Sequence, residues 1–282
     1  MRHILLTALA TLAITTLAAT TGAQAQTLTP DQIAAIVAAP DRSQADRTND
    51  LRRKPEPMLA FIGIKPGITA FDLSAAGGYT TELLARSVGP TGTVYGQSPP
   101  RNPDAKAPAA PEGNSNPTLP AAAPAPGPFR PSPVALADRN EKIKAAGAKA
   151  ATIIPVSRPF ADPFPPEIAD AKLDLVTLMF NYHDLGHMGV DRAAMNAATF
   201  RALKPGGMYV LADHAGRPGT GIGESGTLHR IEEAFLRKEV EAAGFRLAAE
   251  GTFLRNPNDP RDKNTPDPPQ PKDEMVLKFV KP

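Results

Sequence analysis

The stretch from Ile68 to Gln97 places the strongest constraint on how this chain can fold. Its apolar start predicts a short buried strand over 68–73, and the small residues at 74–78 predict a tight turn. A helix with an apolar stripe follows, and a Gly-Pro break separates it from a strand that begins at Thr93. A small-residue turn between a strand and a helix lets a ligand approach the backbone, and the helix N-terminus favours an anionic group. This stretch therefore predicts the nucleotide-cofactor site of an α/β domain.

The rest of the chain continues to alternate strands with helices. Further strands are expected at residues 152–154, 173–180, 208–212, 245–254 and 274–280. Further helices are expected at residues 135–146, 191–203 and 228–243. Alternating strands and helices favour a mostly parallel sheet that helices cover on both faces. The last two strands have no helix between them, so we expect them to form an antiparallel hairpin.

The N-terminal 25 residues have the pattern of an export signal. Arg2 supplies a positive charge, residues 4–17 are apolar or Thr, and Ala23-Gln24-Ala25 fits a cleavage site. The apolar run is short for a membrane span, and no later stretch is long and apolar enough for one. We therefore expect cleavage near Ala25 and a periplasmic or secreted protein that is not membrane-bound after cleavage.

The chain of 282 residues is long enough for one large α/β domain over 63–282. Residues 26–62 predict a helical lead-in, which starts with a helix cap at Thr29-Pro30-Asp31. Residues 99–133 are rich in Pro and Ala and contain almost no large apolar side chain. Such a segment cannot bury enough surface to fold, so we expect a disordered or polyproline-like insertion.

The charge and cysteine content exclude several classes of function. The net charge is only +2, which gives no electrostatic footprint for nucleic acid. No cysteine is present, and this excludes a disulfide framework and Cys-based zinc sites. We therefore expect a small-molecule substrate and no nucleic-acid partner.

Three motifs together resemble class I S-adenosylmethionine-dependent methyltransferases. They are Asp72–Gly78 after the first strand, Leu173–Val176 in the fourth strand, and Leu203–Gly207 before the fifth strand. More closely, residues 42–282 are similar to exported methyltransferase-like proteins of bacteria. The resemblance implies a Rossmann-like, seven-stranded sheet that ends in an antiparallel hairpin. It also implies S-adenosylmethionine as cofactor and methyl transfer to a small molecule by a methyltransferase-like domain over 63–282.

The resemblance assigns the cofactor contacts one residue at a time. The acidic residue that opens the family's first motif matches Asp72. The three glycines of that motif fall on Ser74, Ala76 and Gly78. The acid that usually takes the ribose hydroxyls falls at Gln97, whose amide can accept a hydrogen bond without the strength of a carboxylate. The other expected cofactor contacts are Gly77, Tyr79, Phe160, Asp162, Phe180 and Asn181.

Polar residues follow two strands that the fold makes neighbours. His183 and Asp184 come after the fourth strand, and His214 comes after the fifth. Open α/β sheets bind ligands at the carboxyl ends of their strands. A histidine near its normal pKa can orient or deprotonate a methyl acceptor, and the sulfonium donor needs mainly proximity and alignment. We therefore predict His183, Asp184 and His214 as catalytic residues.

The same residue types also suit a metal ion. His183 and His187 are four residues apart, which places two ligands together only on a helix. Gly186 and Gly189 argue against a helix there, so the sequence predicts no metal site. His229 is expected on the helix at 228–243, within a surface ion-pair network.

Two other functions remain open at this point. A non-catalytic ligand-binding protein of the same fold would explain the altered glycine turn and the export signal, since S-adenosylmethionine is made in the cytosol. The dense polar residues at the strand ends favour the enzyme. A nicotinamide dehydrogenase is the weaker alternative, because the glycine spacing after Asp72 does not match its fingerprint.

Overall fold

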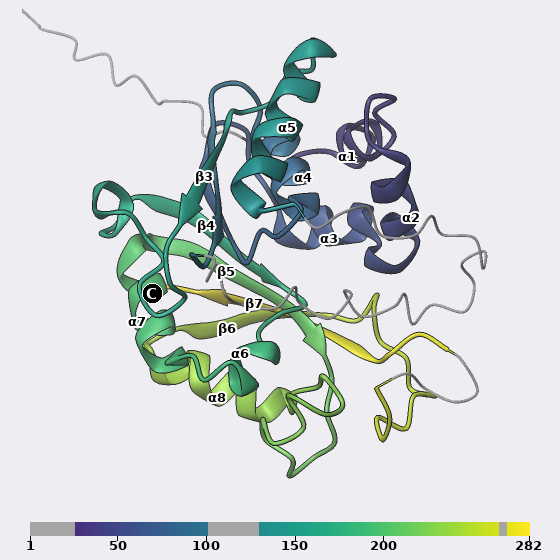
Figure 1. The fold of residues 1–282 in the computed structure, drawn as a ribbon, viewed down its shortest axis with the longest axis vertical. Coiled ribbons are helices and arrows are strands. Elements are labelled where there is room, and N and C mark those ends of the chain that lie inside the picture. Colours follow the sequence, from purple (N-terminus) through teal and green to yellow (C-terminus); the bar gives the residue numbers. More distant parts are fainter. Residues whose placement is uncertain (1–25, 101–129, 265–269) are drawn as a thin grey trace, which may run out of the picture.

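A seven-stranded sheet runs through the protein in the order β3-β2-β1-β4-β5-β7-β6 (Figure 1). The computed structural model describes residues 26–100, 130–264 and 270–282. The strands are β1 (Thr69–Leu73), β2 (Thr93–Ser98), β3 (Ile153–Ser157), β4 (Leu173–Met179), β5 (Leu203–His214), β6 (Arg246–Gly251) and β7 (Glu274–Val280). Strands β1 to β5 pair in parallel, and β7 is antiparallel to both β5 and β6. The predicted Rossmann-like sheet with an antiparallel C-terminal pair is therefore confirmed.

Helices cover both faces of this sheet. They are α1 (Pro30–Val37), α2 (Gln44–Arg53), α3 (Pro55–Ile62), α4 (Tyr79–Val88), α5 (Ser132–Ala145), α6 (Asp184–His187), α7 (Arg192–Ala202) and α8 (Glu233–Ala242), with a 3₁₀ turn at Pro166–Ile168. Figure 1 shows α1 to α5 on one side of the sheet and α6 to α8 on the other. Among the described residues, no helix is both long and apolar enough to span a membrane.

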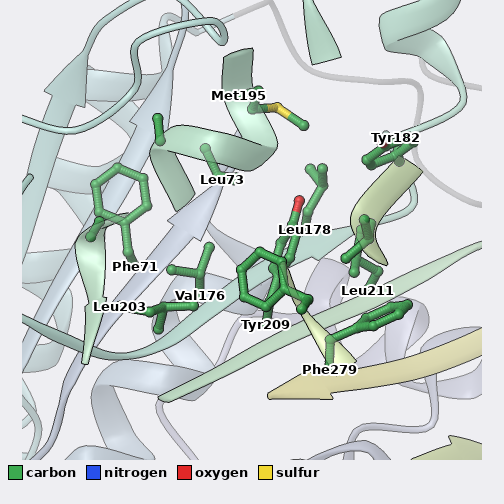
Figure 2. Packing of buried hydrophobic residues seen from close by; sticks show 14 of the residues in the cluster. Phe71, Leu73, Val176, Leu178, Tyr182, Met195, Leu203, Tyr209, Leu211 and Phe279 are labelled. Carbon is green, nitrogen blue, oxygen red and sulfur yellow. The ribbon is translucent and has the colours of Figure 1, made fainter. Parts of the chain in front are cut away.

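The sheet separates two hydrophobic cores. In β4, Val176 and Leu178 point into the core drawn in Figure 2, whereas Leu175 and Met179 belong to the core on the α1–α5 side. Side chains of a strand alternate between the two faces, so a strand buried on both sides reads as a nearly continuous apolar run. This is why residues 173–180 gave the clearest strand signal in the sequence.

The helical lead-in contains a helix that the hydrophobic pattern did not indicate. Helix α2 is highly charged, and its N-cap Ser43 accepts a hydrogen bond from the backbone of Asp46. The buried side chain of Asp46 binds Arg139 of α5 through two hydrogen bonds of 2.7 and 2.9 Å. Ion pairs to other helices, rather than an apolar stripe, therefore hold α2 in place.

Two boundaries near the strand ends differ from the sequence expectation. Residues 184–187 form one helical turn, although Gly186 and Gly189 argued against a helix. Helix α8 begins at Glu233, five residues later than expected, because Ile231 first forms a parallel bridge with Ala215. His229, with a left-handed backbone at φ +50°, therefore lies in the segment before the helix and not on its surface.

The predicted insertion ends earlier than expected. Helix α5 begins at Ser132, so the last residues of the segment 99–133 already belong to a helix. Residues 101–129 of that segment, and the predicted export signal at 1–25, lie outside the described residues.

Candidate functional site

The turn after β1 has the backbone conformation of a glycine turn, although two of its three key residues are not glycine. The φ angles are +61° at Ser74, +47° at Ala76 and +80° at Gly78. These are the positions of the three glycines that the resemblance implied. A left-handed backbone costs an L-residue roughly 1–2 kcal/mol. The turn has therefore kept its shape while Ser74 and Ala76 make it strained.

Replacing Ala76 by glycine is expected to stabilise the protein. Ala76 is exposed, so its methyl group contributes little packing. Removing the left-handed strain gains roughly 1–2 kcal/mol, and the extra freedom of glycine in the unfolded chain costs about 0.5–1 kcal/mol. We expect Ala76→Gly to raise the free energy of unfolding by about 0.5 kcal/mol, measured by urea denaturation.

The matched control for this change is Gly77→Ala. Gly77 is not left-handed, and no described atom lies within 4 Å of the Cβ that alanine would add. This variant should be neutral or gain up to about 1 kcal/mol. If Ala76→Gly instead loses the roughly 1 kcal/mol typical of an ordinary alanine-to-glycine change, the strained turn is refuted.

Asp72 is buried and binds side chains of the adjacent helix and strand. Its side chain is buried and accepts hydrogen bonds from Thr81 Oγ1 at 2.6 Å and Thr177 Oγ1 at 2.8 Å. Burial raises the pKa of Asp72 to about 6, although both hydrogen bonds oppose that rise. Asp72 therefore links β1 to α4 and β4.

The side chain of Gln97 also makes hydrogen bonds within the protein. It is fully buried, its Oε1 accepts a hydrogen bond from Ser74 N at 3.1 Å, and its Nε2 donates to Arg158 O at 2.6 Å. Both polar atoms are therefore occupied at the position where the resemblance implied a ribose contact.

Helix α5 closes the adjacent side of the turn. Arg139 Nε donates to Gly77 O at 2.6 Å, and Leu136 lies so close that a Cβ at Gly78 would be 2.6 Å from its Cδ2. A Cβ at Gly96 would meet the same leucine at 2.7 Å. The space at Gly78 and Gly96 is therefore filled by side chains of α5, whereas Gly77 stays open.

Two of the other expected cofactor contacts, Phe160 and Asp162, belong to the segment after β3. Phe160 is buried in the core on the α7–α8 side, and Asp162 is exposed and pairs with Arg158. The partly buried Asn181 lies after β4, before α6. None of these three residues lines either of the two cavities near Arg53 and Arg52 that are described below.

An arginine without a direct ion pair among the described residues lies at the N-terminus of α4. Arg53 makes no hydrogen bond or ion pair with any described residue, and its Nε is buried without a partner. Its guanidinium carbon lies 5.1 Å from the ring centroid of Tyr79 and 4.8 Å from that of Phe180. Burial, and then the charge of Arg52, lower the pKa of Arg53 to about 10, so it stays charged at neutral pH.

The helix beside Arg53 also lacks a side-chain cap. The N-cap of α4 is Gly78, which has no side chain to accept from the first backbone amides. The backbone of Thr81 interacts with Asp72, and the amides before it receive no cap from Gly78. Such amides and an unpaired arginine together suit a bound carboxylate. The small cavity between them, of about 20 Å³, is lined by Arg53, Pro55, Met58, Leu59, Ile62, Tyr79, Thr80, Leu83, Leu84, Met179 and Phe180.

A larger cavity of about 370 Å³ lies between the end of α2 and the segments after β6 and before β7. Arg52 lines it, lies 4.7 Å from the Phe180 ring centroid, and donates to Glu274 Oε1 at 2.6 Å. Phe180 thus lies between two consecutive arginines, each of which lines a different cavity. The rest of the lining is Leu51, Lys54, Leu254, Arg255, Asn256, Asn258, Gln270, Pro271, Lys272 and Glu274.

His214 connects Phe180 to this larger cavity. Its ring centroid lies 5.8 Å from that of Phe180, and its Nδ1 lies 3.1 Å from Glu274 Oε1. Burial opposes the charge of Glu274, but His214 and the arginines Arg52 and Arg53 outweigh it and hold the pKa of that carboxyl below its usual value. The pair formed by His214 at the end of β5 and Glu274 at the start of β7 therefore reaches the larger cavity through Glu274.

The predicted pair His183 and Asp184 forms a second polar group. His183 is 1% exposed, its Nδ1 lies 2.5 Å from Asp213 Oδ1, and its Nε2 lies 3.1 Å from Asp184 Oδ1. Burial opposes the imidazolium, but the nearby carboxylates of Asp213 and Asp184 outweigh it and raise the pKa of His183 to about 10.

His187 and His229, which were not predicted as site residues, join this group. His229 Nδ1 lies 2.8 Å from Asp184 Oδ1, and the ring of His229 lies 5.7 Å from the rings of both His183 and His187. Glu232 and Glu233 mark the true start of α8, since acidic residues favour a helix N-terminus. That signal could have placed His229 in the segment before the helix.

Comparisons with known proteins agree with the fold. No family model and no curated protein sequence matches the chain. A solved S-adenosylmethionine-dependent methyltransferase from Aquifex aeolicus superposes with a TM-score of 0.50 at 16% identity, over 86% of this chain and 100% of that chain. A complex of the Haloferax volcanii Trm112 methyltransferase activator with a putative methyltransferase gives 0.51 at 16% identity, over 90% and 99%. The protein therefore has the Rossmann-like fold seen in class I S-adenosylmethionine-dependent methyltransferases.

Proposed function

We propose that the protein transfers a methyl group from S-adenosylmethionine to a small molecule. The fold supports this chemistry in general terms, and one local observation carries the proposal. That observation is the unpaired Arg53 beside the uncapped N-terminus of α4, directly after the strained turn. The methionine part of the cofactor ends in a carboxylate, which an arginine and free backbone amides bind well.

The residues suit the methionine end of the cofactor better than its adenosine end. A cavity of about 20 Å³ cannot contain a nucleoside, since small-molecule pockets typically need roughly 300 Å³ or more. Residues of the segment 53–62 line this cavity, and Gln97 and Leu136 fill the neighbouring space. Binding of the whole cofactor therefore requires the side chains that fill this space to rearrange.

The acceptor would approach from the larger cavity. When bound, the cofactor supplies an activated methyl group on a sulfonium. The chain's own residues then have to orient the acceptor and take its proton. Glu274 lines the 370 Å³ cavity, and His214 Nδ1 lies 3.1 Å from its carboxylate, so this pair is placed for this role.

Calorimetric titration of the full chain with S-adenosylmethionine and S-adenosylhomocysteine tests the proposal. We expect micromolar binding, and Arg53→Gln should weaken it by about 10- to 100-fold, since a hydrogen bond to a charged group contributes roughly 1.5–3 kcal/mol. The neighbouring Arg52→Gln is the matched control, because Arg52 is already paired with Glu274. It should change the affinity by less than about threefold.

Two outcomes would contradict the proposal. Absence of binding up to millimolar cofactor would remove S-adenosylmethionine as the ligand. Equal losses of affinity in the two arginine variants would show that the carboxylate does not bind at Arg53.

A further inference from the structure

We infer that His183, Asp184 and His229 form a binding site for a divalent transition-metal ion of the Zn²⁺ type. One ligand atom of each residue, namely His183 Nε2, a carboxylate oxygen of Asp184 and a ring nitrogen of His229, lies within 4.8 Å of the other two. His183 and Asp184 lie at the start of α6, and His229 lies in the segment before α8. Their spacing in the sequence therefore does not indicate a metal site. This inference does not depend on the proposed methyl transfer.

The buried Nε2 of His183 is the observation that points to a ligand. His183 is almost completely buried, and its Nε2 has no hydrogen-bond partner among the described residues. It lies 3.1 Å from Asp184 Oδ1, but not in a hydrogen-bonding direction. Unpaired buried nitrogen atoms are costly, and an ion between the ring and the carboxylate would satisfy both.

The other side of the His183 ring supports the same conclusion. Its Nδ1 lies 2.5 Å from Asp213 Oδ1, and Asp213 is fully buried. Metal-binding histidines usually direct their second nitrogen to a carboxylate, which fixes the ring and makes the first nitrogen a better ligand. Asp213 is itself held by the backbone amides of His183 and His214, so this support is rigid.

The distances are compatible with a single ion. Asp184 Oδ1 lies 3.1 Å from His183 Nε2 and 2.8 Å from His229 Nδ1. Ligands about 2.0–2.2 Å from Zn²⁺ lie roughly 3–4 Å from one another, so a shift of less than about 1 Å completes the set. Two imidazoles and one carboxylate suit Zn²⁺ or a similar ion, and they leave a coordination position for water or a ligand.

Zinc titration of the full chain, purified without a histidine tag and treated with chelator, tests this inference in the absence of any cofactor. We expect one equivalent of Zn²⁺ to bind, and Co²⁺ to give visible absorption bands at the same stoichiometry. His229→Gln and Asp184→Asn should each weaken binding by about 100-fold or more. Both residues are only partly buried, so the variants should fold, and their unfolding transitions check this.

His214→Gln is the matched control for metal affinity. Its ring lies 5.2 Å from that of His183, but it faces Phe180 and Glu274 rather than Asp184. Zinc affinity should stay within about threefold of the wild type. The inference is overturned if the wild type binds neither ion, if the Asp184 and His229 variants bind as the wild type does, or if His214→Gln loses as much affinity as they do.

Discussion

Replacing Arg230 by methionine is expected to lower the free energy of unfolding by about 3–5 kcal/mol, because it leaves a buried charge without its partner. Arg230 is fully buried and pairs with Asp259 at 2.8 and 3.3 Å. It also donates to the backbone carbonyls of Ala215 and Lys263. These contacts fix the segment that carries His229, so the same change should also disturb the proposed metal site of His183, Asp184 and His229.

Urea denaturation measures this effect, and Arg237→Met provides the matched control. Arg237 pairs with Glu250 at 2.9 Å, and their side chains are 36% and 44% exposed. An exposed pair contributes roughly 0–1 kcal/mol, so the control should lose no more than that. Adding Asp259→Asn to Arg230→Met should recover part of the stability, since it removes the unpaired carboxylate. Equal small losses in the two single variants would refute the buried pair.

Replacing Gln97 by glutamate is the second change with a large expected effect. One carboxylate oxygen could still accept from Ser74 N, but the other would face the carbonyl of Arg158 with no proton between them. A buried polar contact of this kind costs about 2–4 kcal/mol at neutral pH. We therefore expect Gln97→Glu to destabilise the fold by that amount in urea denaturation.

The pH dependence gives a sharper test of the same contact. Burial raises the pKa of the new carboxyl above its unfolded value. Its protonated form can donate to Arg158 O, so the loss of stability should be small in acid and grow as the pH rises through the raised pKa. Gln44→Glu is the matched control, because Gln44 is exposed at the start of α2. It should stay within about 0.5 kcal/mol of the wild type at all pH values. A pH-independent loss at Gln97 would contradict this explanation.

The sequence alone determined the fold because the signals of the sheet are local. Residues 173–180 alternate between two buried faces, and the small residues after Asp72 break the chain between a strand and a helix. The final strands lack an intervening helix, so only an antiparallel pair was open to them. These patterns follow from backbone geometry and burial, which the spacing of apolar and small residues in the sequence indicates directly.

The candidate site was predicted only in part, because its chemistry depends on contacts between distant segments. The sequence correctly indicated polar residues at the ends of the fourth and fifth strands. It could not show that Gln97 is tied to Ser74 and Arg158, since residues 61 positions apart make that contact. It also could not show that Arg53 is unpaired, because an arginine in a charged stretch is usually exposed to solvent and needs no partner within the protein.

The stretch from Ile68 to Gln97 therefore predicted the strand, turn and helix of the candidate site. Tertiary packing decided which side chains surround that turn. Local sequence specified the left-handed turn through its small residues, even where glycine is absent. The residues that pack around the turn come from α2, α3 and α5. The proposed metal ligands His183, Asp184 and His229 also come from two distant segments. Packing of these distant segments is set by the total burial and charge pairing of the folded chain, and no single stretch of sequence contains it.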